Sequence, residues 1–335
     1  MEKKTTIIAE AGVNHNGDIN NACKLIKVAS DAGADFVKFQ SFNPNNVVIE
    51  DAPKAEYQIK NTKENESQLN MIKRFYLNYE EHRTLLEHCR KNNIGFFSTA
   101  FDIESLDMLI NLGLKMFKIP SGEITNYPLL KKIAYLNKTT IMSTGMASIT
   151  EIEAAINTLY KYGIEKKKLI VLHCNTNYPT PVNEVNLKMM NNIKEKFNVR
   201  VGFSDHTMGS EISLAAVALG AEVIEKHFTM DRSLPGPDQK CSLEPDELKF
   251  LIQSIRNIEK SMGSKNKVLS KEEEKNKAIV RKSIVALKDI KKGEIFSELN
   301  ITTKRPESGI SPMRWNEIIG KKAKKNFYYN ELIEL

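Results

Sequence analysis

The chain lacks any long hydrophobic run. No stretch of about 18 residues is uninterruptedly apolar, and the N-terminal segment MEKKTTIIAEAG holds no extended apolar part. A membrane-spanning helix needs about 20 predominantly apolar residues, and a secretory signal peptide needs an apolar segment near the start of the chain. We therefore expect a cytoplasmic protein that does not bind a membrane.

Cysteine is scarce, and its spacing excludes two kinds of site. The four cysteines, Cys23, Cys89, Cys174 and Cys241, lie far apart, and none belongs to a CxxC pair. A disulfide framework or a structural zinc site needs closer, paired spacing. We expect four reduced thiols.

Basic residues are only modestly in excess over acidic residues. The 335 residues include 49 lysines and arginines against 42 aspartates and glutamates, which gives a formal net charge of +7. The lysines are interspersed with glutamates, and no basic stripe interleaved with aromatic residues is present. This pattern argues against nucleic-acid binding and is compatible with an anionic small substrate.

Short apolar runs alternate with amphipathic helical segments along most of the chain. Capping signals such as Asn78 before Glu81 and Ser148 before Glu151 mark helix starts, and glycines follow several helices. Eight strand–helix units within about 250 residues predict a closed (β/α)8 TIM barrel, which has this number of units in a chain of this length. The predicted strands are Thr6–Ala9, Phe36–Phe39, Ile94–Phe97, Met116–Ile119, Thr139–Met142, Leu169–Leu172, Val199–Phe203 and Val223–Lys226.

The composition divides the chain into three parts. We expect the barrel in residues 1–263, a charged linker in residues 264–277 in which Ser270 and Glu273 can cap a short helix, and a small module in residues 278–335. The module is too small for a large core of its own. Within the barrel, the segment 43–71 is too long for a simple loop and is expected to form a lid or a wall of the site.

Two histidines follow the last two predicted strands. His206 comes after the seventh strand and His227 after the eighth. If these strands are parallel neighbours, both imidazoles project from the same end of the barrel and can share one divalent ion with open positions for water and substrate. Two unrelated core or rim histidines are the alternative, and polar residues at the ends of the other six strands argue against it.

Two lysines lie within apolar strands. An unpaired lysine there is costly, so Lys38 and Lys118 need anions beside them, for which Glu10 and Glu123 are the candidates. The pairing can be purely structural, or the lysines can also hold a ligand with two negative groups. A Schiff-base lysine is a third possibility, which the histidine pair makes redundant.

Taken together, a series of motifs resembles the bacterial sialic acid synthases. The resemblance runs in order through essentially the whole chain and includes a C-terminal module similar to the antifreeze-like (SAF, β-clip) domain of that family. The motifs are EAGVNHNG, VKFQSF, FKIPSGE, STGM, HCNTNYPTP, GFSDHT, EKHFT, GPD and KKGEIFSELNITTKRPESGI.

The resemblance implies a set of site residues and partners. His206 and His227 match the ligands of a divalent metal, usually manganese, with cobalt or magnesium also possible. Arg305 matches an arginine that reaches the active site of the partner subunit in a domain-swapped homodimer. Gln40, Tyr178 and Asp238 match positions near an N-acetylated amino sugar. The phosphoenolpyruvate positions are matched by Glu10, Lys38, Thr99, Lys118, Ser121, Ser143 and Ser204.

The resemblance also implies a reaction. The enol carbon of phosphoenolpyruvate attacks the aldehyde of the open-chain sugar, water adds at C2, and phosphate leaves by C–O cleavage. A metal on the two histidines would polarise the aldehyde. Lys118 is expected to act in catalysis, and Glu10, Glu123 and Asp205 are the candidates for moving protons, with Glu123 preferred because it closes the FKIPSGE strand.

The sugar is the least determined part of this hypothesis. Gln239 and Glu307 depart from residues common in the family, and both fall in segments expected near the sugar. Our first expectation is N-acetylneuraminate synthase acting on N-acetylmannosamine. The alternatives are N,N'-diacetyllegionaminate synthase acting on 2,4-diacetamido-2,4,6-trideoxymannose, pseudaminic acid synthase and, from another class, a non-catalytic sugar-binding or ice-binding protein.

Overall fold

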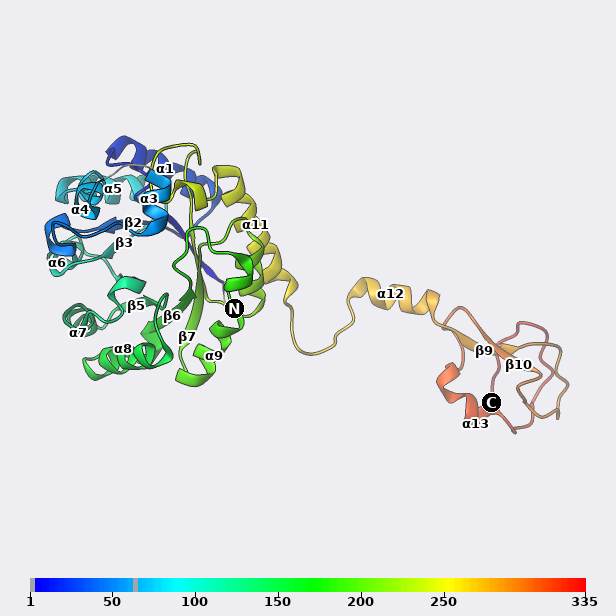
Figure 1. The fold of residues 1–335 in the computed structure, drawn as a ribbon. Helices are drawn as coiled ribbons and strands as arrows, with labels where there is room; N and C mark the ends of the chain where they lie inside the picture. The colour runs from blue at the N-terminus through cyan, green and yellow to red at the C-terminus, as the bar shows by residue number, and fades with distance from the viewer. Residues whose placement is uncertain (1–3, 63–65) are drawn as a thin grey trace. The chain divides into compact units, whose positions relative to one another are not determined.

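The computed structural model describes residues 4–62 and 66–335. It divides the chain into two compact units, Met1–Gly263 and Ser264–Leu335. The first unit contains a closed barrel of eight parallel strands in sequence order, with helices around the outside (Figure 1). The predicted (β/α)8 fold is confirmed. The strands are β1 (Thr6–Gly12), β2 (Phe36–Ser41), β3 (Gly95–Ala100), β4 (Met116–Ile119), β5 (Thr139–Ser143), β6 (Leu169–Cys174), β7 (Arg200–Asp205) and β8 (Val223–His227).

Each helix of the outer layer buries an apolar stripe against the strands. The predicted capping boxes are present, since Asn78 and Glu81, and likewise Ser148 and Glu151, each satisfy the other's backbone N–H group. The outer helices are α1 (Ile19–Ala32), α5 (Tyr79–Lys91), α6 (Ile103–Asn111), α7 (Tyr127–Leu136), α8 (Ile149–Lys161), α9 (Lys188–Phe197), α10 (Glu211–Ala218) and α11 (Pro245–Ser261). Short 3₁₀ helices occupy Ser121–Glu123, Lys166–Lys168, Val182–Glu184 and Gln239–Cys241.

The interior of the barrel changes character along its axis. One layer is a buried apolar cluster that includes Ile8, Phe97, Ile141 and Val223. Because side chains alternate along a strand, the residues two positions later face the same side. Those positions hold Glu10, Thr99, Ser143 and Glu225, so the barrel is apolar below and polar toward the carboxyl ends of its strands.

The long insertion between β2 and α5 folds over this end of the barrel. It contains the short helices α2 (Pro44–Val47), α3 (Glu56–Thr62) and α4 (Gln68–Lys73). Phe42, Met71, Phe75 and Val13 form a separate small apolar cluster here. The insertion therefore has a core of its own beside the mouth of the barrel.

The second unit is built around a two-stranded antiparallel sheet of β9 (Ser283–Ala286) and β10 (Ile301–Lys304). Its core is a cluster of nine buried apolar residues, among them Phe296 and Phe327. The part predicted as a linker is partly helical, because α12 (Lys271–Val280) begins at Ser270 with a capping box to Glu273. A 3₁₀ turn, Pro312–Arg314, leads into α13 (Trp315–Ile318).

Candidate active site

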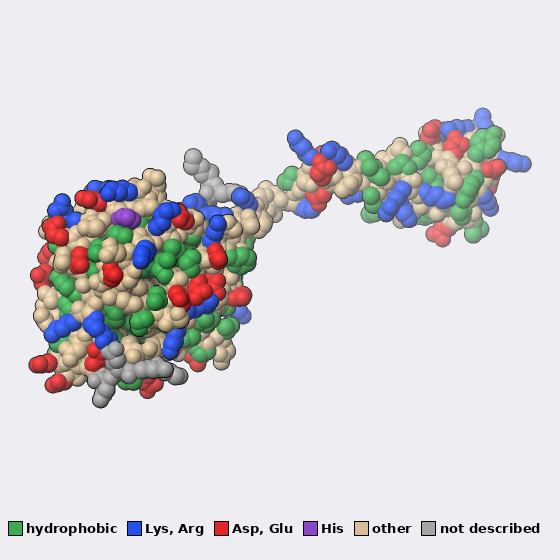
Figure 2. Space-filling model, turned by 90° about the horizontal axis from the view of Figure 1, so that it is seen from above, with side chains coloured by type: hydrophobic (Ala, Val, Ile, Leu, Met, Phe, Trp, Pro, Cys, Tyr) green, Lys and Arg blue, Asp and Glu red, His purple; other side chains and the backbone are tan. Residues whose placement is uncertain are grey.

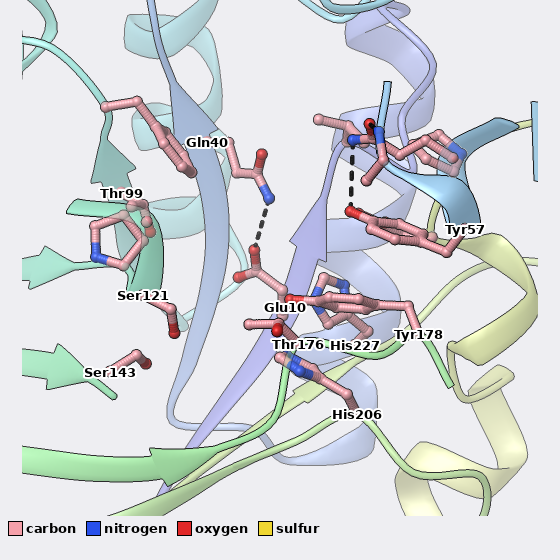
Figure 3. A pocket seen from close by; sticks show the side chains of 18 of the residues that line it. Glu10, Gln40, Tyr57, Thr99, Ser121, Ser143, Thr176, Tyr178, His206 and His227 are labelled. Atoms are coloured by element: carbon pink, nitrogen blue, oxygen red, sulfur yellow. Dashed lines mark hydrogen bonds between the residues drawn. The ribbon is translucent and has the colours of Figure 1, made fainter. Parts of the chain in front are cut away.

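A cavity of about 950 Å³ lies at the carboxyl ends of the barrel strands. Its wall includes residues from every strand or from the loop after it, as expected for this fold. Figure 3 shows the hydroxyl groups of Thr99, Ser121 and Ser143 toward one side and the rings of Tyr178, His206 and His227 toward the other. Twelve residues predicted from the sequence line it: Glu10, Lys38, Gln40, Thr99, Lys118, Ser121, Ser143, Tyr178, Ser204, His206, His227 and Asp238.

Two lysines and two glutamates form a buried network at the base of this cavity. Glu225 accepts bonds from the Lys118 ammonium at 2.8 and 2.9 Å, and its Oε2 lies 3.4 Å from the Lys38 Nζ. Lys38 Nζ also lies 3.0 Å from Glu10 Oε2 and donates to Thr99 Oγ1 at 2.9 Å. The four charged groups are each less than 5% exposed, so each needs the others to offset its desolvation.

The pKa values of the two carboxyl groups in this network, Glu10 and Glu225, are shifted in opposite directions. Burial raises the pKa of Glu10 to about 7, since desolvation outweighs the attraction of Lys38. Burial also favours neutral Glu225, but Lys118 and Lys38 outweigh it and hold the pKa of Glu225 below its ordinary value. Near neutral pH, Glu225 is therefore a fixed anion, and Glu10 can both accept and release a proton.

Hydroxyl and amide groups line the wall beside the lysines. The Gly145 N–H donates to Ser121 Oγ at 3.0 Å, and Ser143 Oγ is buried without a hydrogen-bond partner among the described residues. A Cβ atom at Gly145 would lie 2.8 Å from Ser121 Oγ, so no larger residue fits there without displacing that hydroxyl. Ammonium groups with nearby hydroxyls suit an anion bearing both phosphate and carboxylate.

His206 and His227 face each other across the other wall. Their ring centroids are 5.4 Å apart. His206 Nδ1 donates to the Asn175 carbonyl at 2.5 Å, which fixes the ring and leaves Nε2 with its lone pair. Burial lowers the pKa of His206 to about 4, and burial together with His206 lowers the pKa of His227 far below its ordinary value. Both rings are therefore neutral and able to bind a cation.

The histidine pair fits a divalent metal that takes its remaining ligands from water and substrate. The two neutral imidazoles, with ring centroids 5.4 Å apart, would hold the ion between them and leave its other positions open. His227 Nδ1 is buried and has no hydrogen-bond partner within the described part of the chain. Among residues 4–62 and 66–335, no group of three or more His, Cys, Asp or Glu side chains is arranged to hold a metal.

A column of rings connects the insertion to the histidines. Tyr178, from the loop after β6, packs against His206 with ring centroids 4.1 Å apart and the rings tilted by 31°. On the other side of Tyr178, the ring of Tyr57 from α3 stacks at 4.9 Å. Asn61 Nδ2, also on α3, donates to the Pro237 carbonyl at 2.6 Å. These contacts hold α3 over the cavity and make it the wall that the sequence predicted.

Gln40 and Asp238 supply polar groups between the two walls. Gln40 Nε2 donates to Glu10 Oε1 at 3.5 Å, a long bond that a ligand can replace. Burial raises the pKa of Asp238 to about 6. Asp238 is 6% exposed and lines the cavity, which leaves its carboxyl group available to a ligand hydroxyl or amide.

Three predicted site residues lie outside the cavity wall. Glu123, our preferred proton-transfer group, turns away after β4, and its Oε2 accepts from Asn126 Nδ2 at 2.6 Å. Asp205 follows Ser204 on β7 and therefore faces the helix layer, where it lies 3.0 Å from Lys226 Nζ and accepts from Ser213. Neither placement fits the proton-transfer role we assigned. Arg305 is exposed within the second unit, and its predicted role stays a prediction.

The structure adds residues that the sequence analysis did not select. One of them is Glu225, which pairs mainly with Lys118, for which Glu123 was our candidate partner, and also with Lys38 at 3.4 Å. The alternation of β8 contained a signal, because Glu225 lies two residues before His227 and so faces the same side. Phe42, Phe101 and Met71 also line the cavity, and no polar motif marked them.

Comparisons with known proteins identify the family of this chain. The NeuB family model matches residues 25–267, and the SAF domain model matches residues 281–334. N,N'-diacetyllegionaminic acid synthase from Campylobacter jejuni is 61% identical over 331 residues, which cover 99% of both chains. The protein of the same name from Legionella pneumophila is 45% identical and covers 96% of this chain and 90% of its own.

A solved structure supports the same assignment. N-acetylneuraminic acid (sialic acid) synthetase from Leptospira borgpetersenii has a TM-score of 0.71 and 38% identity, covering 82% of this chain and 90% of that chain. Within the described residues, no helix is both long and apolar enough to cross a bilayer. The motifs, the barrel and these matches agree over nearly the full length, and the chain therefore belongs to the NeuB family, as an enzyme of the synthase type with a C-terminal SAF domain.

Proposed function

We propose that this protein is a nonulosonic acid synthase that makes N,N'-diacetyllegionaminate. It would condense phosphoenolpyruvate with open-chain 2,4-diacetamido-2,4,6-trideoxymannose and water, releasing phosphate. The observation that supports this most directly is one cavity in which two buried lysines lie near a pair of neutral histidines. The names of the Campylobacter and Legionella relatives favour this sugar over N-acetylmannosamine, which we had expected first.

Phosphoenolpyruvate would bind on the lysine side of the cavity. Lys38 and Lys118 attract its carboxylate and phosphate, while Thr99, Ser121 and Ser143 provide hydroxyl groups that fix its orientation. Glu225 is already bonded to both lysines, so it holds the two ammonium groups in place before the substrate arrives. Preorganised cations would then stabilise the negative charge of the departing phosphate.

The sugar would bind on the histidine side. His206 and His227 would hold a divalent metal, which we propose to be manganese with cobalt or magnesium as substitutes, and which would act as a Lewis acid on the aldehyde oxygen. Tyr178 packs against His206 and limits the space beside it. Asp238 and Gln40 would orient the open chain through its hydroxyl or amide groups.

Glu10 is the residue we now propose for proton transfer. It lies beside Lys38, is 1% exposed, and has a pKa raised to about 7. A carboxyl group poised near neutral pH can take a proton from the water that adds at C2 of the enolpyruvyl group. As the C3–C1 bond forms, the enol double bond is consumed and the oxygen of water bonds to C2; the C2–O bond to phosphate then breaks as the C2 carbonyl forms. One proton of the water goes to the aldehyde oxygen, which becomes a hydroxyl group, and the other leaves with phosphate.

Phosphate release from phosphoenolpyruvate tests the reaction. We expect release to require both a metal and an amino sugar, and mass spectrometry of the product to show one condensed 2-keto acid per phosphate. Substrate competition should favour the diacetamido sugar over N-acetylmannosamine by at least about tenfold. Phosphate release without any sugar would indicate a phosphatase, and no release with either of these sugars or the pseudaminic acid precursor would favour a sugar-binding protein.

We also propose that the protein works as a domain-swapped homodimer. Arg305 is exposed within its own unit, and that unit has a core of only nine buried apolar residues. In the assembly we propose, Arg305 of one protomer would contribute a positive charge to the sugar side of its partner's cavity. Analytical ultracentrifugation should give twice the mass of one chain, and a monomer with full activity would contradict the proposal.

A further inference from the structure

The mouth of the barrel is apolar over three neighbouring strands. The residues that directly follow β1, β2 and β3 are Val13, Phe42 and Phe101, and all three line the cavity. The rings of Phe42 and Phe101 meet edge to face with centroids 6.3 Å apart. After β5, β6 and β7 the corresponding residues are polar, namely Thr144, Asn175 and His206.

The insertion completes this apolar region from the other side. Val47 from α2, Ile72 from α4 and Phe75 just after α4 also line the cavity. Phe75 is 5% exposed, whereas Val47 and Ile72 are half-buried. We call the region bounded by Val13, Phe42, Val47, Ile72, Phe75 and Phe101 the apolar alcove. Val13, Phe42 and Phe75 belong to the small core described above, and the half-buried Val47, Ile72 and Phe101 extend it to the cavity surface.

The position of the alcove relates it to the sugar side of the site. Gln40, which we assign to the sugar, lies on β2 two residues before Phe42. Figure 3 shows Gln40 above Glu10, and the dashed bond joins their side chains. A sugar that reaches Gln40 while its aldehyde lies near the histidines therefore has its far end close to the alcove.

We propose that the apolar alcove selects the substrate by receiving its methyl groups at C6 and on the C4 acetamido group. The inference rests on the proposed function, because only the diacetamido trideoxy sugar carries both groups. N-acetylmannosamine has hydroxyl groups at those two carbons. An apolar wall gives a hydroxyl no hydrogen-bond partner in place of water, so it disfavours the more polar sugar.

The expected size of the preference for the diacetamido sugar follows from the effect of one methyl group on binding. One methyl group in an apolar pocket changes kcat/KM by about 10- to 200-fold. A single polar substitution in the alcove should therefore reduce the preference by about tenfold, without affecting phosphoenolpyruvate, which lies on the lysine side.

Ile72→Thr tests the proposal in the full-length protein with a matched control. The same substitution at Ile49 changes a residue of the same insertion that is 79% exposed and does not line the cavity. We expect Ile72→Thr to lower the ratio of kcat/KM for the diacetamido sugar to that for N-acetylmannosamine by about tenfold. Ile49→Thr should leave the ratio, the KM for phosphoenolpyruvate and the melting temperature unchanged.

Phe42→Tyr provides a second variant that keeps the ring and adds one hydroxyl group. It should lower the same ratio and retain the wild-type KM for phosphoenolpyruvate. If the wild-type protein prefers N-acetylmannosamine, the proposed sugar is wrong. If the wild-type protein prefers the diacetamido sugar and both alcove variants keep that preference unchanged, the alcove proposal alone is wrong.

Discussion

The two units of this chain carry their charge in opposite ways. Residues 1–263 contain 32 basic and 32 acidic residues, whereas residues 264–335 contain 17 basic and 10 acidic residues. The whole net charge of +7 therefore belongs to the smaller unit. All six histidines lie in the larger unit. On the face of the larger unit seen in Figure 2, acidic and basic side chains are interspersed.

This difference separates two uses of charge. In the barrel, Lys38, Lys118, Glu10 and Glu225 are buried and compensate one another, which makes their positions fixed and costly to change. In the SAF unit, most charged side chains are exposed, so their excess acts on ligands and surfaces at long range and is screened by salt. Changes in the barrel should therefore be severe and local, and changes in the SAF unit should be moderate.

The largest effect is expected in the barrel at His206. His206→Ala removes one of the two proposed metal ligands, and turnover should fall by about three orders of magnitude, in line with the loss of transition-state stabilisation. The measurement is phosphate release after metal stripping and reloading with manganese. Full activity in the variant would contradict the metal assignment.

Glu225→Gln should affect stability more than any other single charge change. The substitution leaves Lys118 and Lys38 with only Glu10 to balance them, which should cost roughly 3 kcal/mol of unfolding free energy. As a control, Glu247→Gln breaks a partly exposed pair with Arg232 and should cost less than about 1 kcal/mol. Urea unfolding measures the free energy of unfolding of both variants. Equal losses in the two would show that the buried network contributes no more to stability than an exposed ion pair does.

Acid should destabilise the barrel through its buried histidines. Burial lowers the pKa of His15 to about 4 and also lowers that of His82. As the pH falls, these histidines therefore bind protons in the unfolded chain before they do so in the folded one. Their contribution to the free energy of unfolding is complete above pH 6.5 and is lost as the pH falls toward 4. His15 alone should account for roughly 3 kcal/mol.

Urea unfolding between pH 7 and pH 4 measures this loss. His15→Gln should reduce the loss over that interval, whereas the SAF unit, which has no histidine, should show no such dependence. An unchanged pH dependence in His15→Gln would contradict the assignment to this residue.

Removal of the SAF unit should leave a folded barrel. Truncation after Gly263 preserves all eight strands and their apolar core, so circular dichroism should change only in proportion to the residues lost. The kcat/KM for the sugar should fall substantially, by at least about tenfold, if the unit supplies a charge to the site. A truncated enzyme with wild-type turnover would refute that contribution.

The smallest effect is expected for a single arginine of the SAF unit. Arg305→Ala should raise the KM for the sugar about tenfold and leave the melting temperature unchanged, because Arg305 is exposed. Arg314→Ala is a matched control, since Arg314 is also exposed and pairs with Glu317 at 2.8 Å. Equal behaviour of the two variants would remove the reason to assign Arg305 to the site.

Much of the fold could be predicted because alternation and capping are local signals. Seven of the eight strand ends were predicted too early, the exception being β4, since polar residues such as Glu10 and Ser204 were taken to lie beyond the strands, although in this barrel they remain in the sheet. The same local signals identified twelve cavity residues, because the carboxyl end of a parallel strand is easily located.

The contacts that could not be predicted from the sequence depend on the register of the strands and on the direction in which the chain turns after them. The pairing of Lys118 with Glu225 joins residues 107 positions apart on non-adjacent strands, and no local pattern specifies it. Glu123 lies outside the cavity wall because the chain turns into a 3₁₀ helix, Ser121–Glu123, just after β4. The alcove was missed because Phe42 and Ile72 look like ordinary core residues until the cavity is located.

The strand pair β7–β8 joins polar side chains on both of its faces, by a hydrogen bond on one face and by an ion pair on the other. Ser204 and Glu225 are opposite each other and face the cavity, while their neighbours Asp205 and Lys226 are also opposite each other and face the helices. Sliding one strand by a single residue would send a carboxylate into the hydrocarbon of the outer layer and an ammonium group into the catalytic side. A shift in register between β7 and β8, the strands that carry both histidines, is thus unfavourable on both faces of the sheet. The barrel therefore closes in the register that assembles its site.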